Sequence, residues 1–289
     1  MEKIKKVRIK EDLPALPILI YFLILVGIPL LLVILLSFLS RDNLGNVLFE
    51  FTLDNYKKMF DPIYLRVFFN SFSLAFLTGV ITLLIGYPVA YFTVSLNRKL
   101  RSLVILLIML PFWISSLLRT YGWSILLGRS GLINNVLLFL NIIDEPLNMM
   151  YNFGTVLTGT AYMLIPFMII SIYNSVDRLD RSLLEASYDL GGSKIKTFLN
   201  VTLPLTMPGI AGGFTLVFIP ALGLYYISDL LGGGNTMFLG NLINNMATKG
   251  RNRPLASAFA VGMILLVLLV LLIYSRMSKN SVQGDNKGR

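Results

Sequence analysis

Six long runs of apolar residues constrain the fold of this chain more than any other feature of its sequence. A helix needs about 20 residues to cross a hydrocarbon core of about 30 Å, because it rises about 1.5 Å per residue. Apolar runs of this order lie at 14–39, 67–96, 100–127, 153–176, 207–231 and 255–275. Hydrophobic residues make up 55% of the 289 positions, which would leave large apolar patches exposed on a soluble protein. The sequence therefore predicts an all-α integral membrane protein with six transmembrane helices in one domain, 14–275.

The first apolar run follows a basic leader, "MEKIKKVRIKEDLP", as the apolar region of a secretory signal peptide would. The run is too long for that region and lacks a small-residue cleavage site. We therefore expect it to be retained as the first span, with residues 1–13 and 276–289 as short cytoplasmic tails.

The Lys and Arg residues that flank the spans predict the orientation, because positive flanks are held on the cytoplasmic side. With both termini in the cytoplasm, the inner segments carry sixteen of these residues and the outer segments eight. The outer set includes the run "KGRNR" at 249–253, which opposes the bias. We expect a multi-pass protein of the bacterial plasma (inner) membrane. Its net charge of +10 indicates contact with anionic membrane lipids rather than with nucleic acid.

Several kinds of chemistry are excluded by composition. The chain has no cysteine and no histidine, so disulfides, thiolate nucleophiles, imidazole bases and the usual zinc or haem ligands are absent. The run at 232–234 is no phosphate-binding loop, because no Gly-Lys-Ser/Thr follows it there or occurs elsewhere. The sequence predicts a chain that is not an enzyme, has no metal or cofactor of its own and cannot hydrolyse ATP.

A polar segment at 177–206, broken by glycine, lies between the fourth and fifth apolar runs. Helix formers at helical spacing as far as Leu190 predict a first short helix, and the glycines at 191–192 end it. Ser193 can cap a second helix with its hydroxyl, and Pro204 ends that helix or follows its last turn. In the predicted topology this elbow is cytoplasmic. It is either an amphipathic hairpin on the inner leaflet or a docking surface for a soluble partner.

Within the elbow, Glu185-Ala186-Ser187 is followed by Gly191 and then by Val201-Thr202-Leu203-Pro204. The spacing resembles the "EAA…G…I-x-L-P" loop of binding-protein-dependent ABC importer permeases, with Ser for the second Ala and Val for Ile. In that family the loop sits in a cleft of the cytoplasmic ATPase. The resemblance implies a type I importer permease fold, a homologous second permease subunit and two copies of an ATPase that binds ATP and Mg. It assigns the ATPase contact to Glu185, Ala186, Ser187, Asp189, Gly191, Leu203 and Pro204.

A narrower resemblance extends along almost the whole chain. Blocks in the same order at fitting distances resemble the permeases of spermidine/putrescine importers. They are "FTLDNYKKMFDPIY" (51–64), "LPFWISSLLRTYGW" (110–123), "LLEASYDLGGSK" (183–194), "LPLTMPGI" (203–210) and "PALGLYYISDLLGGG" (220–234). This resemblance implies a polyamine cargo and an extracytoplasmic polyamine-binding protein. Importers of other small solutes share parts of these blocks, so a permease for another solute is the alternative.

A polyamine needs carboxylates to pair with its ammonium groups and aromatic faces to lie against. Acidic residues within apolar spans are rare because their burial is costly, and Asp229, toward the outer end of the fifth run, is the one clear case. Tyr225 and Tyr226 precede it by four and three residues and share its side of a helix. Alternatively, Asp229 pairs with Arg119 and the tyrosines belong to an interfacial belt. Further candidates for the outer mouth are Trp113, Arg119, Tyr121 and Trp123.

Two other features have simpler interpretations. The four-residue spacing of Gly209 and Gly213 suits close packing of helices. Prolines at 88, 111, 166 and 220 would kink or break their helices. A secondary transporter that works without ATP is the rival class. It predicts inverted repeats and several charges within the spans, whereas this chain shows no repeat and few such charges.

Overall fold

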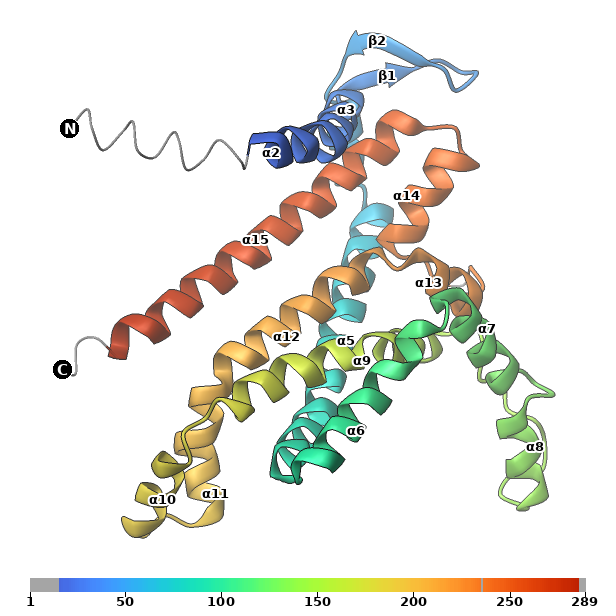
Figure 1. Cartoon of the computed structure of the whole chain (residues 1–289). Coiled ribbons are helices and arrows are strands. Elements are labelled where there is room, and N and C mark those ends of the chain that lie inside the picture. Colours follow the sequence, from blue (N-terminus) through green and yellow to red (C-terminus); the bar gives the residue numbers. More distant parts are fainter. Residues whose placement is uncertain (1–15, 235, 286–289) are drawn as a thin grey trace, which may run out of the picture. The chain divides into compact units, whose positions relative to one another are not determined.

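The computed structural model describes residues 16–234 and 236–285, and most of them form helices (Figure 1). The expected N-terminal tail, 1–13, lies outside these residues. Contacts divide the chain into two compact units. The first consists of Met1–Tyr64 with Ile243–Ile264, and the second of Leu65–Leu242 with Leu265–Arg289.

The elements follow one another along the chain as short and long helices with one hairpin. They are α2 (Leu16–Phe22), the π-helix η2 (Leu23–Gly27), α3 (Ile28–Ser37), β1 (Leu39–Arg41), β2 (Val47–Phe51), α4 (Asp54–Met59), α5 (Pro62–Ser95), α6 (Arg98–Met109), the 3-10 helix η3 (Leu110–Trp113), α7 (Ser116–Leu127), α8 (Leu132–Phe139), α9 (Phe153–Asp177), α10 (Arg181–Asp189), α11 (Lys194–Thr197), the π-helix η4 (Phe198–Thr202), α12 (Leu203–Gly223), α13 (Tyr225–Gly232), α14 (Leu239–Thr248) and α15 (Arg253–Asp285).

Five described helices are long and apolar enough to cross a membrane, and a sixth span results if one bent pair is counted as a single span. The five run over Pro17–Ser37, Pro62–Ser95, Phe153–Asp177, Lys194–Gly223 and Arg253–Leu272. This confirms the predicted all-α membrane fold. The last helix, α15, continues to Asp285, so part of the expected C-terminal tail is helical.

The third apolar run, 100–127, does not form one straight helix. The helical stretch that ends with η3 and the stretch that begins with α7 meet at an angle of 92°. Pro111 lies in the last turn before this break, where its missing N–H and its ring weaken a regular helix. Ile114 then adopts extended backbone angles (φ −92°, ψ 136°), which separates the two helices.

The fifth span begins earlier than the apolar run at 207–231. One continuous helix of 30 residues runs over Lys194–Gly223, through α11, η4 and α12. The expectation that Pro204 ends a helix is therefore wrong. In the π-turn η4, the N–H of Leu203 bonds to the carbonyl of Phe198, five residues back. Such a wide turn displaces the carbonyl that would otherwise clash with the proline ring, so the helix continues.

The outer part of the same apolar run forms a separate helix. The spanning helix stops at Gly223, and the next residue, Leu224, has a ψ of 71° that no α-helix contains. This break follows Pro220 by four residues. Asp229 therefore lies on the short helix α13 rather than on the spanning helix where it was expected.

Helices α9 and α12 pack closely through small residues. A Cβ at Gly209 would lie 2.3 Å from the Cβ of Ser175, and one at Gly213 would lie 2.7 Å from the sulfur of Met168. The Ser171 hydroxyl donates a 2.8 Å hydrogen bond to the Gly209 carbonyl across the same contact. The glycine spacing read from the sequence thus serves the packing of these two helices.

The hairpin of β1 and β2 was not expected from an all-α prediction. Its strands are antiparallel, with Arg41 opposite Val47. The Asp42 carboxylate accepts hydrogen bonds from the backbone N–H groups of Leu44 and Asn46, and Gly45 adopts a positive φ of 90°. Aspartate and glycine at such positions are typical turn signals, so the "SRDNLGNV" stretch carried the information.

Candidate functional site

The elbow between α9 and α12 has the local structure that its sequence predicts. Helix α10 begins after Asp180, whose carboxylate accepts a 3.0 Å hydrogen bond from the backbone N–H of Ser182. This bond is the main reason that the pKa of Asp180 lies below its ordinary value. Gly191 ends the first arm with a φ of 80°, and the Ser193 hydroxyl accepts from the N–H of Lys196 at 3.3 Å. The predicted helix stop and helix cap are both present.

The two arms of the elbow are joined by a contact that the sequence alone did not reveal. The hydroxyls of Ser187 on α10 and Thr197 on α11 are hydrogen-bonded at 2.9 Å, and Thr197 is buried. Gly192 passes so close that an added Cβ would lie 2.6 Å from the Ser187 carbonyl oxygen. Ser187, the departure from the Ala of the EAA pattern, therefore links the arms, and Gly192 leaves room for them to meet.

Most of the predicted coupling residues border a groove between the two arms. The groove has a volume of about 750 Å³, and its lining includes Ala186, Ser187, Gly191 and Pro204. Glu185 lies elsewhere, in a smaller recess of about 390 Å³ whose lining comes from α5, α9, α10 and η4. The remaining two predicted residues are outside the groove lining: Asp189 is exposed and Leu203 is half-buried.

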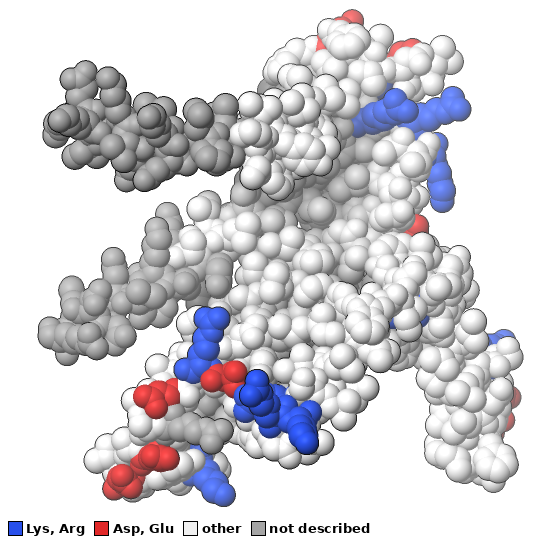
Figure 2. All heavy atoms as spheres, in the orientation of Figure 1, with Lys and Arg blue, Asp and Glu red and all other residues white. Residues whose placement is uncertain are grey.

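The tip of the elbow exposes apolar side chains between charged ones. The exposed fraction is 89% for Leu190 and 72% for Ile195. Lys194 and Lys196 lie beside Ile195 and are exposed as well. Figure 2 shows charges of both signs around α10 and α11. Aliphatic side chains this exposed within a polar rim are typical of a surface that another protein covers.

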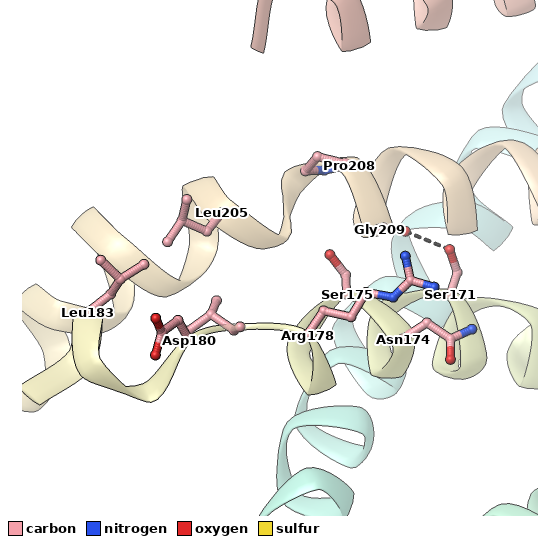
Figure 3. Close-up of a pocket in the computed structure, with 10 residues that line it drawn as sticks. Ser171, Asn174, Ser175, Arg178, Asp180, Leu183, Leu205, Pro208 and Gly209 are labelled. Carbon is pink, nitrogen blue, oxygen red and sulfur yellow. Dashed lines mark hydrogen bonds between the residues drawn. The ribbon is translucent and has the colours of Figure 1, made fainter. Parts of the chain in front are cut away.

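A polar recess of about 520 Å³ lies at the root of the elbow, where α10 meets α9 and α12 (Figure 3). Ser171, Asn174, Ser175 and Arg178 contribute one polar face of α9, at helical spacing. Figure 3 shows the Arg178 side chain lying along α9, with its guanidinium between the two serines. This face was not predicted from the sequence, although the segment "SIYNSVDR" contains the spacing.

An ion pair fixes the turn between α5 and α6 to the end of α9. Arg101 Nη1 lies 2.6 Å from the Asp177 carboxylate, and its Nη2 donates to the Val94 carbonyl at 2.5 Å. Both charged side chains are partly exposed. The contact therefore positions the base of the elbow rather than forming a reactive site.

The predicted cargo residue, Asp229, lies on α13 and is exposed. Its carboxylate accepts a hydrogen bond from the amide nitrogen of Asn241 on α14, whose side chain is buried. Because the amide nitrogen faces the carboxylate, the Asn241 oxygen points away and is left buried without a hydrogen-bond partner among the described residues. Asn241 was not predicted, and its place beside Asp229 could not be read from a separation of 12 residues.

Arg119 does not pair with Asp229 in this structure. The ion pairs within the described part of the chain are Lys57–Asp54 and Arg101–Asp177. The Arg119 guanidinium instead lies over the Phe112 ring, 5.5 Å from its centroid. Its Nε and Nη1 atoms are buried and lack hydrogen-bond partners among the described residues.

The predicted aromatic residues lie in two places. Tyr225 and Tyr226 belong to α13, and the others belong to η3 and α7. Tyr225 and Tyr226 contact each other edge to face, with ring centroids 6.2 Å apart, and Trp123 packs against Tyr162 of α9 at 5.5 Å. Trp113 and Tyr121 are exposed, as is Tyr225. Aromatic faces are thus available near the break in the third span, although among the described residues no hydrogen bond joins these side chains to the Asp229 carboxylate.

Relatives of this chain are transport proteins. The model of the family "Binding-protein-dependent transport system inner membrane component" matches residues 82–283. The spermidine/putrescine transport system permease protein PotB of Escherichia coli is 41% identical over 259 residues, covering 90% of this chain and 94% of that protein. PotB of Haemophilus influenzae is also 41% identical, over 261 residues and 90% of both chains.

Solved structures share the fold at low sequence identity. A bacterial ABC transporter involved in the import of alginate aligns with a TM-score of 0.74 and 18% identity, over 97% of this chain and 99% of the other. The MetNI methionine ABC transporter aligns with a TM-score of 0.58 over 75% of this chain and 95% of the other. From its family match and its extensive identity to these permeases, we conclude that the chain belongs to the binding-protein-dependent transport system inner membrane components, the permeases of ABC importers.

Proposed function

We propose that this chain is the permease subunit of an ABC importer for polyamines, with spermidine and putrescine as cargo. The observation that carries the proposal is the 41% identity, over 90% of the chain, to permeases named for spermidine/putrescine transport. A second, homologous permease completes the pathway, two copies of a cytoplasmic ATPase bind ATP and Mg, and an extracytoplasmic binding protein delivers the cargo. Hydrolysis of ATP thus takes place outside this chain.

The proposed orientation has both termini in the cytoplasm of a bacterial inner membrane. The twofold excess of Lys and Arg in the segments assigned to the inner side supports it. In this orientation the elbow of α10 and α11 is cytoplasmic, and the β1–β2 hairpin lies outside. The bilayer then covers the apolar side chains of the first span, because the most apolar part of this helix has no residue buried within the chain.

The elbow is the proposed contact with the ATPase. Leu190 and Ile195 are the apolar side chains at its tip that a partner would cover. Glu185, Ala186, Ser187, Asp189, Gly191, Leu203 and Pro204 are the residues that the EAA pattern assigns to this contact. The hydrogen bond between Ser187 and Thr197 supports the proposal, because it lets the two arms respond to a partner as one body.

The second arm of the elbow is also the beginning of a spanning helix. This continuity suggests how a movement of the ATPase is transmitted to the membrane span. The run Lys194–Gly223 is continuous, so a displacement at the tip moves the spanning helix without an intervening loop. Close packing through Gly209 and Gly213 then carries α9 with α12. We propose that closure of the ATPase moves this pair of helices and switches the pathway from outward-open to inward-open.

The proposed transit site for the cargo is the Asp229 carboxylate with the aromatic rings of Tyr225 and Tyr226. Trp113, Arg119, Tyr121 and Trp123 are proposed for the outer mouth. One carboxylate with cation–π support contributes a few kcal/mol at best, which is too little to capture a polyamine from dilute solution. Selection therefore belongs to the binding protein, and a weak site in the permease allows inward release.

The test is uptake of labelled spermidine and putrescine into proteoliposomes that contain the assembled complex, with ATP enclosed and the binding protein added. We expect ATP-dependent uptake that unlabelled polyamines compete away. Competition by amino acids or sugars instead would assign the importer another small solute. Uptake without ATP and without the ATPase subunit would favour the rival class of secondary transporters.

A further inference from the structure

The first unit contains a basic recess where the tip of the β1–β2 hairpin meets the turn between α14 and α15. Its volume is about 530 Å³, and its lining includes Gly45 of the hairpin, Arg251 of the turn and Arg253, the first residue of α15. Arg41 donates a 3.1 Å hydrogen bond to the Gly250 carbonyl beside it, and Lys249 precedes that glycine. Figure 2 shows basic side chains gathered over this region. Four cations thus share one small surface.

The recess is held in shape by direct contact between its two segments. Arg251 has a φ of 45°, which non-glycine residues seldom adopt. A Cβ at Gly45 would lie 2.9 Å from the Arg251 Cβ, so only glycine fits against the turn. The turn is also closed by hydrogen bonds from Gly250 N to Asn245 O and from Asn252 N to Met246 O, both 2.8 Å. The arginines therefore project from a fixed backbone.

Carboxylates near the recess are occupied elsewhere. Asp42 accepts from the backbone N–H groups of Leu44 and Asn46 and from the Asn46 side chain, and the last of these bonds is the main reason that its pKa is lowered. Glu50 accepts from the Ser40 hydroxyl. Within the described part of the chain, none of the four cations forms an ion pair. Among the described residues, the positive charge of the recess is thus not neutralised by a direct ion pair.

The positive charge of the recess is unfavourable for two reasons. In the proposed orientation it lies outside, against the bias that keeps basic segments in the cytoplasm. An outward cluster of cations also repels a polycationic cargo. Both costs are removed when an anionic partner covers the cluster. Arginine suits such a contact because its planar guanidinium binds a carboxylate in bidentate fashion.

A protein partner fits the surroundings better than a lipid headgroup. Residues 254–259, which follow the recess, are buried in protein, so this part of α15 does not face lipid. Leu44, which lines the recess, and Phe49 of the same hairpin have exposed fractions of 78% and 92%. Arginine and aromatic residues are enriched in protein interfaces. We propose that the recess docks an acidic surface of the solute-binding protein, with Asp or Glu side chains paired to Arg251 and Arg253.

This inference rests on the proposed function for its outward orientation and for its partner. The experiment uses the complete importer in nanodiscs and the labelled solute-binding protein of the same system, and measures the Kd at low and high salt. We expect R251E/R253E to weaken binding roughly tenfold or more at low salt and to flatten its salt dependence. The neutral variant R251N/R253Q, whose asparagine tolerates the positive φ, should have a Kd between those of the wild type and R251E/R253E.

The matched control is K57E/K58E, the same change of charge on the exposed helix α4 of the same unit. The affinity of this variant should stay within about twofold of the wild type, since both lysines lie outside the recess and an exposed ion pair such as Lys57–Asp54 contributes little. ATPase activity without the binding protein should be equal in all variants, which shows that they assemble. Lysine substitutions in the acidic surface of the binding protein should restore the affinity of R251E/R253E.

Equal affinity of R251E/R253E and wild type at low salt would overturn the inference. A second outcome would also overturn it: R251E/R253E keeps the wild-type affinity for the binding protein, but its behaviour no longer differs between anionic and zwitterionic nanodiscs. The recess would then bind lipid headgroups. Failure of wild-type uptake of spermidine and putrescine would overturn the proposed cargo alone, since the docking measurement detects the binding protein whatever it carries.

Discussion

Single hydroxyl and glycine positions determine whether the elbow keeps its shape. The hydrogen bond between Ser187 and Thr197 joins the arms, and the absence of a side chain at Gly192 lets them approach. Gly191 is a glycine for another reason: its φ is 80°, although nothing lies within 4 Å of its missing side chain. Two adjacent glycines thus meet two independent constraints, one of space and one of backbone conformation.

Valine at either glycine should disconnect ATP hydrolysis from transport. Gly192→Val places a side chain against the Ser187 carbonyl, and Gly191→Val forces a β-branched residue into a positive φ. We expect uptake by the reconstituted importer to fall at least roughly tenfold in each case, while membrane insertion and assembly persist. Gly27→Ala is the control, because the added Cβ meets only an ordinary 3.6 Å contact. Full uptake by the valine variants would show that the elbow is not the coupling element.

A substitution of Asp229 tests the proposed transit site for the cargo most directly. Asp229→Asn removes the charge while an amide oxygen remains to accept from Asn241. We expect kcat/KM for spermidine uptake to fall about tenfold, corresponding to about 1.4 kcal/mol for one charge-assisted contact. Asp144→Asn, another exposed acid in a segment assigned to the outside, should have no effect. Unchanged spermidine kinetics in Asp229→Asn would remove this residue from the pathway.

Among the elements, the helix Lys194–Gly223 matters most, because it belongs to the elbow and to the membrane span at once. Its π-turn at Phe198–Thr202 lets the helix accept Pro204 and continue. A rigid connection of this kind transmits displacement, whereas a flexible one would absorb it. The stiffness of η4 should therefore control the efficiency of coupling.

Glycines within this turn should make transport inefficient. The double variant Asn200→Gly/Val201→Gly increases backbone freedom at the junction, because glycine is roughly 1 kcal/mol per residue less favourable in a helix than alanine and is also less favourable than asparagine or valine. We expect ATP hydrolysis to continue while the number of polyamine molecules imported per ATP drops severalfold. The same dipeptide occurs on α8, so Asn135→Gly/Val136→Gly is a matched control that should keep the wild-type ratio. Equal ratios for both variants would argue against transmission through the helix.

At the scale of the whole molecule, the orientation of the chain decides which partner meets which surface. The elbow must lie in the cytoplasm to reach an ATPase, and the basic recess must lie outside to reach a binding protein. The chain has no cysteine, so one introduced thiol can report the side of the membrane without background.

Two single-cysteine variants should report opposite sides. Asn43→Cys lies in the hairpin turn, and Lys194→Cys lies at the elbow; both positions are exposed. A maleimide that cannot cross the membrane should label the first in intact spheroplasts and the second only after permeabilisation. The reverse pattern would invert the proposed orientation, together with the docking surfaces that depend on it.

The sequence by itself determined the membrane class, most of the spans and the two capped arms of the elbow. These features depend on the length of apolar runs and on backbone preferences of neighbouring residues, such as the left-handed conformation of Gly191. It did not determine how the third run breaks near Pro111, because a proline can either kink a helix or end it.

Contacts between residues far apart in the sequence were decided by the tertiary structure alone. The pairing of Asp229 with Asn241, and of Gly45 with Arg251 in the basic recess, has no local signal. Each depends on where one helix or turn stops and how its neighbour packs against it. Such side chains approach only after the elements between them have folded, so their chemistry is set by packing rather than by spacing.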